Sequence, residues 1–336
     1  MPVVLSRLLQ LGFLCFFVTT VSPVAAYTVA KHPKLQAFIQ EMVKTHGFER
    51  AELNAIYGQV QKIPDVVAAM KRPAERLPWY RYRQLFISEQ SAIKGAEFWK
   101  IWSVALKRAE KEYGVPAEFI VAIIGVESRF GRVKGKHRII DSLTTLMLDY
   151  PRRSDFFRSE MKELLLLARE EGMDVLKMKG SYAGAMGIPQ FIASSYRRYA
   201  VDFDGDGKRD LVNNTEDAIG SIANYFSAHK WKEGEPVVSE LKLTKNARPE
   251  SLVGKRFKVA LTEAESRSSG VSLAESTHTK SLFGLVELEQ KDRKTYRAGF
   301  HNFYVITRYN HSTLYAMAVF DLSQEISSKY RNGQSS

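Results

Sequence analysis

Apolar residues recur every three or four positions along most of this chain, which is the spacing of helices that pack one face against a core. The clearest run covers residues 35–46 and ends at Gly47, a residue suited to closing a helix. Pro116 begins another run, and Ser312 is a capping residue before the last one. The predicted helices are 35–46, 53–60, 98–113, 117–126, 142–149, 156–171, 189–199, 215–230 and 313–325.

The pattern changes between Gly234 and Gly299. Short apolar runs at 257–261 and 282–288 contain strand-forming residues, and polar, Ser-rich turns such as 265–272 separate them. Residues 302–307 predict one more strand. Residues 64–78 are expected to be a connecting stretch, and the polar tail after Ser327 is expected to fray.

These patterns predict a mainly α (α+β) protein. Its expected parts are an N-terminal helical region (27–95), a helical core (96–231), a small β-containing insertion (232–300), a strand and helix returning to the core (301–327), and a tail (328–336).

Residues 1–26 have the features of a signal peptide. Arg7 precedes an apolar run over residues 8–21, and small residues end the segment at Ala26, where we expect cleavage. An uncleaved membrane anchor is the alternative, but the run is short for a span of about 20 residues. The only cysteine, Cys15, lies in this segment. The mature chain would therefore have no disulfide, lipid anchor or transmembrane segment, which fits the bacterial periplasm.

Composition narrows the classes of partner. Of the 336 residues, 45% are hydrophobic, which is enough to bury a sizeable core. The net charge of +12 favours an anionic partner, either cell-wall polymer, a membrane surface or nucleic acid. Because no Lys/Arg-dense run or nucleic-acid motif is present, we expect no nucleic acid among the partners. We expect a monomer.

One carboxylate stands where carboxylates are normally excluded. Glu127 extends the apolar stripe of Ile120, Ile123 and Ile124 at the end of a helix. Burial and the negative end of the helix dipole both favour the protonated form, which a general acid for glycosidic cleavage needs. The alternative from periodicity alone is an ion pair with Arg129 or Arg132.

Two motifs bear on this choice. The stretch from Gly125 to Gly131 reads GVESRFG, and the stretch from Gly180 to Phe191 reads GSYAGAMGIPQF. Together they resemble the Glu-Ser and Gly-Ala-x-Gly-x-x-Gln signatures of lysozyme-like lytic transglycosylases. Further stretches at 79–86, 149–153, 217–226 and 307–313 resemble the lytic murein transglycosylase B family. The resemblance runs from about His32 to Leu322.

This resemblance implies a lysozyme-like helical catalytic domain in residues 96–231, with Glu127 as the catalytic residue. It also implies sugar-contacting positions whose side chains suit a glycan, with tyrosine faces for sugar rings, hydroxyls and amides for polar groups, and arginines for carboxylates. Without the resemblance, buried tyrosines and solvated arginines are the simpler interpretation. The implied positions are Tyr82, Ser128, Arg152, Arg153, Ser181, Gln190, Tyr225, Tyr309, Asn310 and Tyr315.

The motif segments contain no obvious second carboxylate, whereas most glycosidases use two. A single acid is therefore expected, with the substrate's own 2-acetamido group stabilising the anomeric carbon. The resemblance implies a lytic transglycosylase that cleaves the MurNAc-β-1,4-GlcNAc bond and leaves a 1,6-anhydromuramyl end, without a catalytic cofactor. The alternatives are a hydrolytic muramidase and a non-catalytic, calcium-dependent peptidoglycan-binding module. A scaffold for other cell-wall enzymes is compatible with catalysis.

An acidic loop at 202–217 begins like an EF-hand calcium loop, with alternating aspartates before a glycine. Asn213 stands where that loop normally has a bidentate glutamate, so the resemblance suggests closure by Asp217 at the next helix. We expect a structural Ca²⁺ here, while a solvated turn or a sodium site is the alternative. The expected ligands are Asp202, Asp204, Asp206, Lys208 (through its carbonyl) and Asp217.

Overall fold

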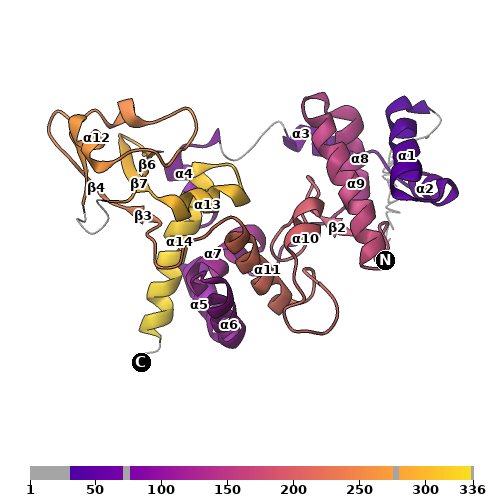
Figure 1. The fold of residues 1–336 in the computed structure, drawn as a ribbon, viewed down its shortest axis with the longest axis horizontal. Helices are drawn as coiled ribbons and strands as arrows, with labels where there is room; N and C mark the ends of the chain where they lie inside the picture. Colours follow the sequence, from indigo (N-terminus) through magenta and orange to yellow (C-terminus); the bar gives the residue numbers. More distant parts are fainter. Residues whose placement is uncertain (1–30, 71–75, 275–279, 334–336) are drawn as a thin grey trace, which may run out of the picture.

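The computed structural model describes residues 31–70, 76–274 and 280–333. The predicted signal peptide and Cys15 lie outside these residues. Within them, no helix combines the length and the apolar character needed to cross a membrane. The helices and strands fall into three parts, which lie side by side in Figure 1.

The first part joins the N-terminal helices to a later helical pair. It contains α1 (Pro33–His46), α2 (Arg50–Tyr57), α3 (Pro64–Met70), α8 (Ile139–Asp149) and α9 (Ser154–Glu170). Gly47 ends α1 in the left-handed conformation, with a φ of 65°, as its position predicted. Arg158 of α9 forms an ion pair with Glu41 of α1, so the N-terminal region is tied to the later helices.

Helix α3 shows that residues 64–78 are more than a connecting stretch. The amide of Ile63 donates to Oγ1 of Thr145 on α8 over 3.0 Å, and Val66 is fully buried. The helix forms because α8 supplies a surface for it, which the local pattern could not reveal.

The second part surrounds α7 (Ala117–Ser128), of which residues 119–126 are all buried. Helices α5 and α14 cross so closely that a Cβ on Gly95 would lie 2.4 Å from the Ile326 side chain, so a larger residue at this position would force the contact to shift. The other elements of this part are α4 (Trp79–Tyr82), η3 (Arg83–Leu85), α5 (Glu89–Ile101), α6 (Ser103–Tyr113), α10 (Ala193–Tyr199), α11 (Thr215–Ala228), α13 (His301–Tyr309) and α14 (Thr313–Asn332).

The single helix predicted over 98–113 is two helices. The chain leaves the helical conformation at Trp102, with φ −103° and ψ 22°, between α5 and α6. Phe98 packs against Phe130 with 5.9 Å between ring centroids, while α6 packs against α11. The two halves therefore pack against different parts of the protein, although the helical spacing of their apolar residues continues across the bend.

The third part is the predicted β-containing insertion, in which some elements differ from expectation. The prediction over 282–288 is confirmed by β6, but 257–261 contributes only a bridge from Leu261 to Phe283. The polar turn at 265–272 is instead α12 and the start of β5, because Thr262 and Glu265 form a capping box. The elements are β3 (Val238–Ser239), β4 (Leu241–Leu243), η5 (Pro249–Leu252), α12 (Glu263–Ser268), β5 (Val271–Leu273), β6 (Gly284–Glu289) and β7 (Lys294–Gly299).

The strands form two small antiparallel sheets, in the orders β3-β7-β6 and β4-β5. Elsewhere, β1 (His137–Arg138) pairs with β2 (Lys179–Gly180), and this pair connects the loop after α7 to the start of the second motif. The remaining short helix is η4 (Pro151–Arg153) before α9.

Two predictions near the C-terminus are wrong. Residues 302–307 lie in helix α13, whose buried face includes Phe303, Ile306 and Thr307. The tail after Ser327 continues α14 to Asn332, because Tyr330 stacks on Trp99 with ring centroids 4.3 Å apart. Ser312 does cap α14, as predicted: its hydroxyl accepts from the amide of Tyr315 over 3.2 Å.

Asp321, near the middle of α14, gives a testable pH dependence. Burial raises the pKa of its carboxyl from 3.8 to about 6, although the charges of Arg83 and Arg297 lower it in part. The folded state therefore holds this proton more tightly than the unfolded state, and its contribution to stability is lost as pH rises from about 4 through 6. We expect Asp321→Asn to raise the free energy of unfolding at pH 7.5 by about 1–3 kcal/mol, with no gain below pH 4.

Urea unfolding at pH 4 and pH 7.5 measures this difference. Asp292→Asn, the same change at an exposed position between β6 and β7, is the matched control and should show no comparable gain. If Asp321→Asn is less stable than the wild type at pH 7.5, attraction to the two arginines outweighs burial.

Candidate active site

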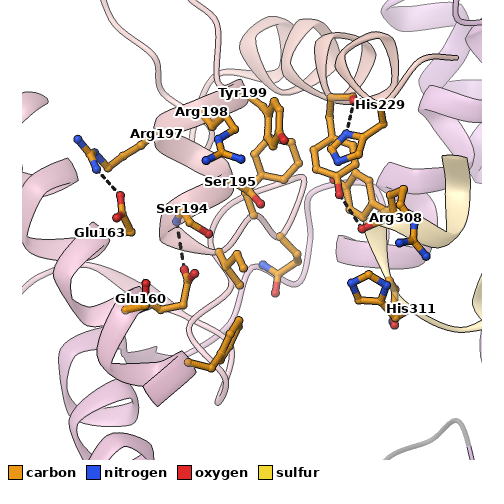
Figure 2. Close-up of a pocket in the computed structure, with 18 of the residues that line it drawn as sticks. Glu160, Glu163, Ser194, Ser195, Arg197, Arg198, Tyr199, His229, Arg308 and His311 are labelled. Atoms are coloured by element: carbon orange, nitrogen blue, oxygen red, sulfur yellow. Dashed lines mark hydrogen bonds and ion pairs between the residues drawn. The ribbon is translucent and has the colours of Figure 1, made fainter. Parts of the chain in front are cut away.

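A groove of about 1390 Å³ lies where the first part meets the second. One wall comes from α9 and α10, and the other from α11, α13 and the turn before α14. Figure 2 shows Glu160, Ser194 and Arg197 on the first wall, opposite Arg308 and His311 on the second. Among the predicted site residues, those lining the groove are Glu127, Arg153, Gln190, Tyr225, Tyr309 and Asn310.

Glu127 lies in the last turn of α7, half-buried, and its carboxylate reaches the groove. Ile120, Ile123 and Ile124 behind it are fully buried, so the apolar stripe predicted from the sequence exists. The hydroxyl of Tyr315 donates to Oε1 of Glu127 over 2.5 Å. This bond fixes one oxygen of the carboxyl group while the helix end presents the group to the groove.

The backbone after Glu127 is unusual. Arg129 and Phe130 both adopt the left-handed conformation, with φ of 51° and 60°. The ring of Phe130 packs over Gly125, where an added Cβ would lie 2.9 Å from it. Arg132, proposed from the sequence as an ion-pair partner, donates from Nε to the carbonyl of Arg129 over 3.3 Å. The sharp turn thus ends the helix directly beside the acid.

Three tyrosines form a wall next to Glu127. The rings of Tyr309 and Tyr315 lie nearly parallel, with centroids 6.4 Å apart. The centroid of the Tyr225 ring lies 4.9 Å from that of Tyr309. Their hydroxyls are fixed: Tyr309 donates to the carbonyl of Pro189 and Tyr225 to that of Arg308, each over 2.6 Å. Burial, and then the charge of Glu127, raises the pKa of Tyr309 and Tyr315. Both remain protonated donors at any physiological pH.

The other predicted sugar-contacting residues differ in access. Tyr82 is 1% exposed and lies behind Tyr315, against Trp79 and Phe86. Ser128 has no exposed surface; its hydroxyl donates to the carbonyl of Ile124 and accepts from the amide of Gly131. These two residues therefore support the site from beneath its surface.

Ser181 and Gln190 hold the loop of the second motif. The Ser181 hydroxyl accepts from the amide of Ala185 over 3.0 Å, and Gln190 donates to the carbonyl of Gly187 over 2.8 Å. Gln190 has a φ of 50°, so its backbone is in the left-handed region while its side chain lines the groove. Arg152 and Arg153 are exposed in η4, and only Arg153 lines the groove.

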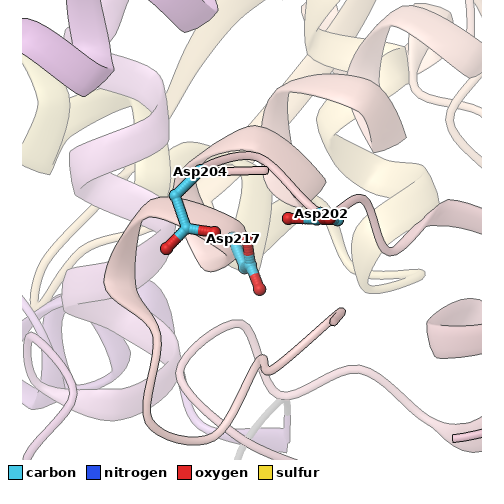
Figure 3. A group of neighbouring side chains, drawn as sticks. All are labelled: Asp202, Asp204 and Asp217. Atoms are coloured by element: carbon cyan, nitrogen blue, oxygen red, sulfur yellow. The ribbon is translucent and has the colours of Figure 1, made fainter. Parts of the chain in front are cut away.

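The acidic loop gathers carboxylates from two elements. Asp202 and Asp204 lie in the loop, and Asp217 lies in the first turn of α11. One oxygen from each falls within 4.8 Å of the others. Figure 3 shows the three side chains. Burial, and then the charges of Asp204 and Asp202, raises the pKa of Asp217. A divalent cation suits such a group because it would neutralise the repulsion.

Another expected ligand, Asp206, lies outside this group of three, and its Oδ1 accepts from the amide of Lys208 over 2.9 Å. Gly205 and Gly207 adopt positive φ values of 82° and 87°, which the sharp turns of this loop require.

Comparison with known proteins identifies the family. Residues 30–324 match the family model described as the transglycosylase SLT domain. The chain is 42% identical to membrane-bound lytic murein transglycosylase B of Escherichia coli over 307 residues, which is 88% of this chain and 83% of that protein. This chain belongs to the SLT-domain family of lytic transglycosylases.

Solved structures agree with this assignment. A catenated lytic transglycosylase, SltB1 of Pseudomonas aeruginosa, has a TM-score of 0.85 and 44% identity, covering 90% of this chain and all of that one (100%). The E. coli lytic transglycosylase Slt35 in complex with calcium has a TM-score of 0.83 and 42% identity, covering 90% and 95%. The predicted mainly α, lysozyme-like fold is therefore confirmed.

Sequence analysis missed one buried acid of this SLT-domain transglycosylase. Glu160 on α9 is 4% exposed at the groove, and burial raises the pKa of its carboxyl. It accepts from the amide of Ser194 over 3.1 Å, so it caps the first turn of α10. Glu160 shares an apolar helix face with Phe157, Met161 and Leu164. An acid on an apolar helix face is the pattern that identified Glu127, so the same pattern could have identified Glu160 from the sequence.

Proposed function

We propose that this transglycosylase cleaves the MurNAc-β-1,4-GlcNAc bond of peptidoglycan and leaves 1,6-anhydromuramyl ends, with Glu127 as the catalytic residue. The observation that carries the proposal is the Glu127 carboxyl group at the end of a buried helix, open to a large groove and bonded to Tyr315. A pure binding module has no need of such a group. The name of the E. coli relative, a murein transglycosylase, supports the substrate.

In the first step, protonated Glu127 donates its proton to the bridging oxygen of the glycosidic bond, the bond between that oxygen and C1 of the muramyl residue breaks, and the GlcNAc end leaves as the alcohol. The other acids that line the groove are engaged elsewhere: Glu163 and Glu170 pair with Arg197, and Glu160 caps α10. The substrate's 2-acetamido oxygen therefore stabilises the anomeric carbon in place of an enzyme nucleophile.

In the second step, ionised Glu127 takes the proton of the muramyl C6 hydroxyl, whose oxygen closes on C1. Tyr315 can bond to Glu127 in both its protonated and its ionised form, because its hydroxyl donates to Oε1 and leaves the other carboxyl oxygen to carry the transferred proton. Exclusion of water from the anomeric carbon by the sugar rings seated on the tyrosine wall would favour ring closure over hydrolysis.

The groove residues suit a glycan strand. Tyr225 and Tyr309 offer flat walls for sugar rings, Gln190 and Asn310 offer hydrogen bonds to hydroxyl and acetamido groups, and Arg153, with Arg152 beside it in η4, offers a cation for carboxylates. Tyr82, Ser128, Ser181 and Tyr315 act by positioning these groups, since their contacts lie within the protein.

The acidic loop is proposed to hold a structural Ca²⁺ through Asp202, Asp204 and Asp217, with Asp206 and the carbonyl of Lys208 as further ligands. Its place between α10 and α11, which both line the groove, supports a structural role for the ion, and the proposed catalysis by Glu127 uses no cofactor. The calcium complex of Slt35 supports the choice of ion. We propose the periplasm as the site of action, following export and signal-peptide cleavage, for a monomer that works on glycan strands beside other cell-wall enzymes.

The products decide between transglycosylation and hydrolysis. Mass spectrometry of material released from purified sacculi should show anhydromuramyl ends, which weigh one water less than reducing ends. Mainly reducing muramyl ends would identify a muramidase instead. If the wild-type protein released no fragments from sacculi, it would be a binding module. The control is an Asp174→Ala variant, changed at an exposed position outside the groove, which should release the same products as the wild type.

A further inference from the structure

Helix α10 begins without a capping side chain of its own. Its N-cap residue is Ile192, whose apolar side chain forms no capping hydrogen bond, so the first amides of α10 need an acceptor from elsewhere. Glu160 of α9 supplies one, because its Oε2 accepts from the amide of Ser194 over 3.1 Å. Figure 2 draws this bond as the dashed line between Glu160 and Ser194. The start of α10 is therefore held by a side chain of another helix.

The carboxyl group of Glu160 is kept in a place that disfavours its charge. Burial raises the pKa of this group, while the hydroxyl and amide of Ser194 and the amide of Ala193 lower it in part. The contacts with α10 therefore offset only part of the cost of burial. Because packing alone favours an apolar side chain on such a helix face, the contact with α10 is the reason to have a carboxyl group here.

The segment just before α10 forms part of the groove surface. Gln190, Phe191 and Ile192 all line the groove. Two backbone hydrogen bonds, of 2.8 and 3.1 Å, join Phe191 to Met186, so the segment is tied to the loop of the second motif at its other end. Ser194 follows only two residues after Ile192. A shift of the first turn of α10 would therefore move groove-lining residues.

Phe191 also packs against the wall of tyrosines. The centroid of its ring lies 5.6 Å from that of Tyr225 and 5.7 Å from that of Tyr309. Glu127, in contrast, belongs to α7, and its carboxyl group bonds to Tyr315 of α14. Movement of the segment would therefore disturb the surface that faces a glycan more than it would disturb the proton donor.

A second contact joins α10 to α9 farther along the helix. Arg197 of α10 pairs with Glu163 and Glu170 of α9, and these side chains are partly exposed. This pairing does not depend on Glu160. We therefore expect α10 to stay on α9 when Glu160 is changed, with the displacement confined to its first turn.

We propose that Glu160 is a positioning residue for the cleavage reaction, whose carboxyl oxygen fixes the first turn of α10 and thereby the groove-lining segment 190–192. The place of the oxygen matters more than its charge, because a neutral acceptor also serves an amide donor. Without the acceptor, the Ser194 amide loses its partner unless the segment moves. This inference rests on the proposed function and deepens it, since it names what sets the affinity of this wall for glycan.

Two variants separate reach from charge. Glu160→Asp keeps the charge but withdraws the oxygen by one methylene group, so it should lose the Ser194 amide. Glu160→Gln keeps the length and an acceptor oxygen without the charge that burial disfavours. With soluble glycan strands as substrate, we expect Glu160→Asp to raise KM about tenfold with little change in kcat, which is the signature of lost binding. Glu160→Gln should restore most of the wild-type KM.

Glu112→Asp is the matched control, because it makes the same change at an exposed position of α6 outside the groove, and it should leave KM and kcat unchanged. A Glu160→Gln protein with a large loss of kcat would show that the charge acts in the chemistry and would overturn the positioning role. Unchanged KM in both Glu160 variants, with only a lower melting temperature, would reduce Glu160 to a structural cap and leave the proposed function standing. If the wild type cleaves no glycan strands, the proposed function fails, and this inference fails with it.

Discussion

Replacing Glu127 by glutamine is expected to reduce cleavage of peptidoglycan by about 10²–10⁴-fold or more, while the protein folds and binds glycan as before. The amide has the shape of the acid but no proton to give to the bridging oxygen. Its oxygen can still accept from the Tyr315 hydroxyl, so the local structure is expected to persist. Release of soluble fragments from sacculi measures the rate, and sedimentation with sacculi measures binding.

Glu118→Gln is the control for this experiment. Glu118 lies in the first turn of the same helix, α7, and does not line the groove, so the change removes the same charge away from the chemistry. We expect this variant to cleave at the wild-type rate. A Glu127→Gln protein that cleaved nearly as fast as the wild type would remove Glu127 from the acid role and require another proton donor.

Calcium is expected to raise the melting temperature of the wild type by several degrees, and chelation to lower it. Asp202, Asp204 and Asp217 repel one another without a cation: burial raises the pKa of Asp217 most, and the charges of Asp204 and Asp202 raise it further. An ion that binds only the folded state stabilises it by about 2.7 kcal/mol at a hundred times its Kd. Cleavage at low temperature should change much less, because the acid chemistry uses no metal.

Asp202→Ala should abolish the effect of calcium on melting, whereas Asp174→Ala, an exposed aspartate paired with Lys177, should retain it. A wild-type melting temperature that does not respond to calcium would contradict a metal site. If chelation instead stopped turnover while the fold stayed intact, the loop would act directly in catalysis.

Helix predictions were most accurate where the signal was local. Gly47 and Ser312 marked true helix ends, because a left-handed closing residue and a capping hydroxyl act within one turn. Predictions were wrong where packing overrode the local pattern. Residues 302–307 have strand-like composition but form α13, because their apolar residues pack at helical spacing within the core.

The sequence by itself determined the family, through two motifs in order, and the most informative acid, through an apolar stripe within a single helix. Both signals lie in contiguous residues, so they need no knowledge of the fold. Only the tertiary structure determined which side chains contact Glu127. Tyr315 lies 188 residues from Glu127, and Arg153 and Arg308 reach one groove from separate helical groups. Such contacts depend on how helices pack, and a residue type alone does not show which neighbour it will have.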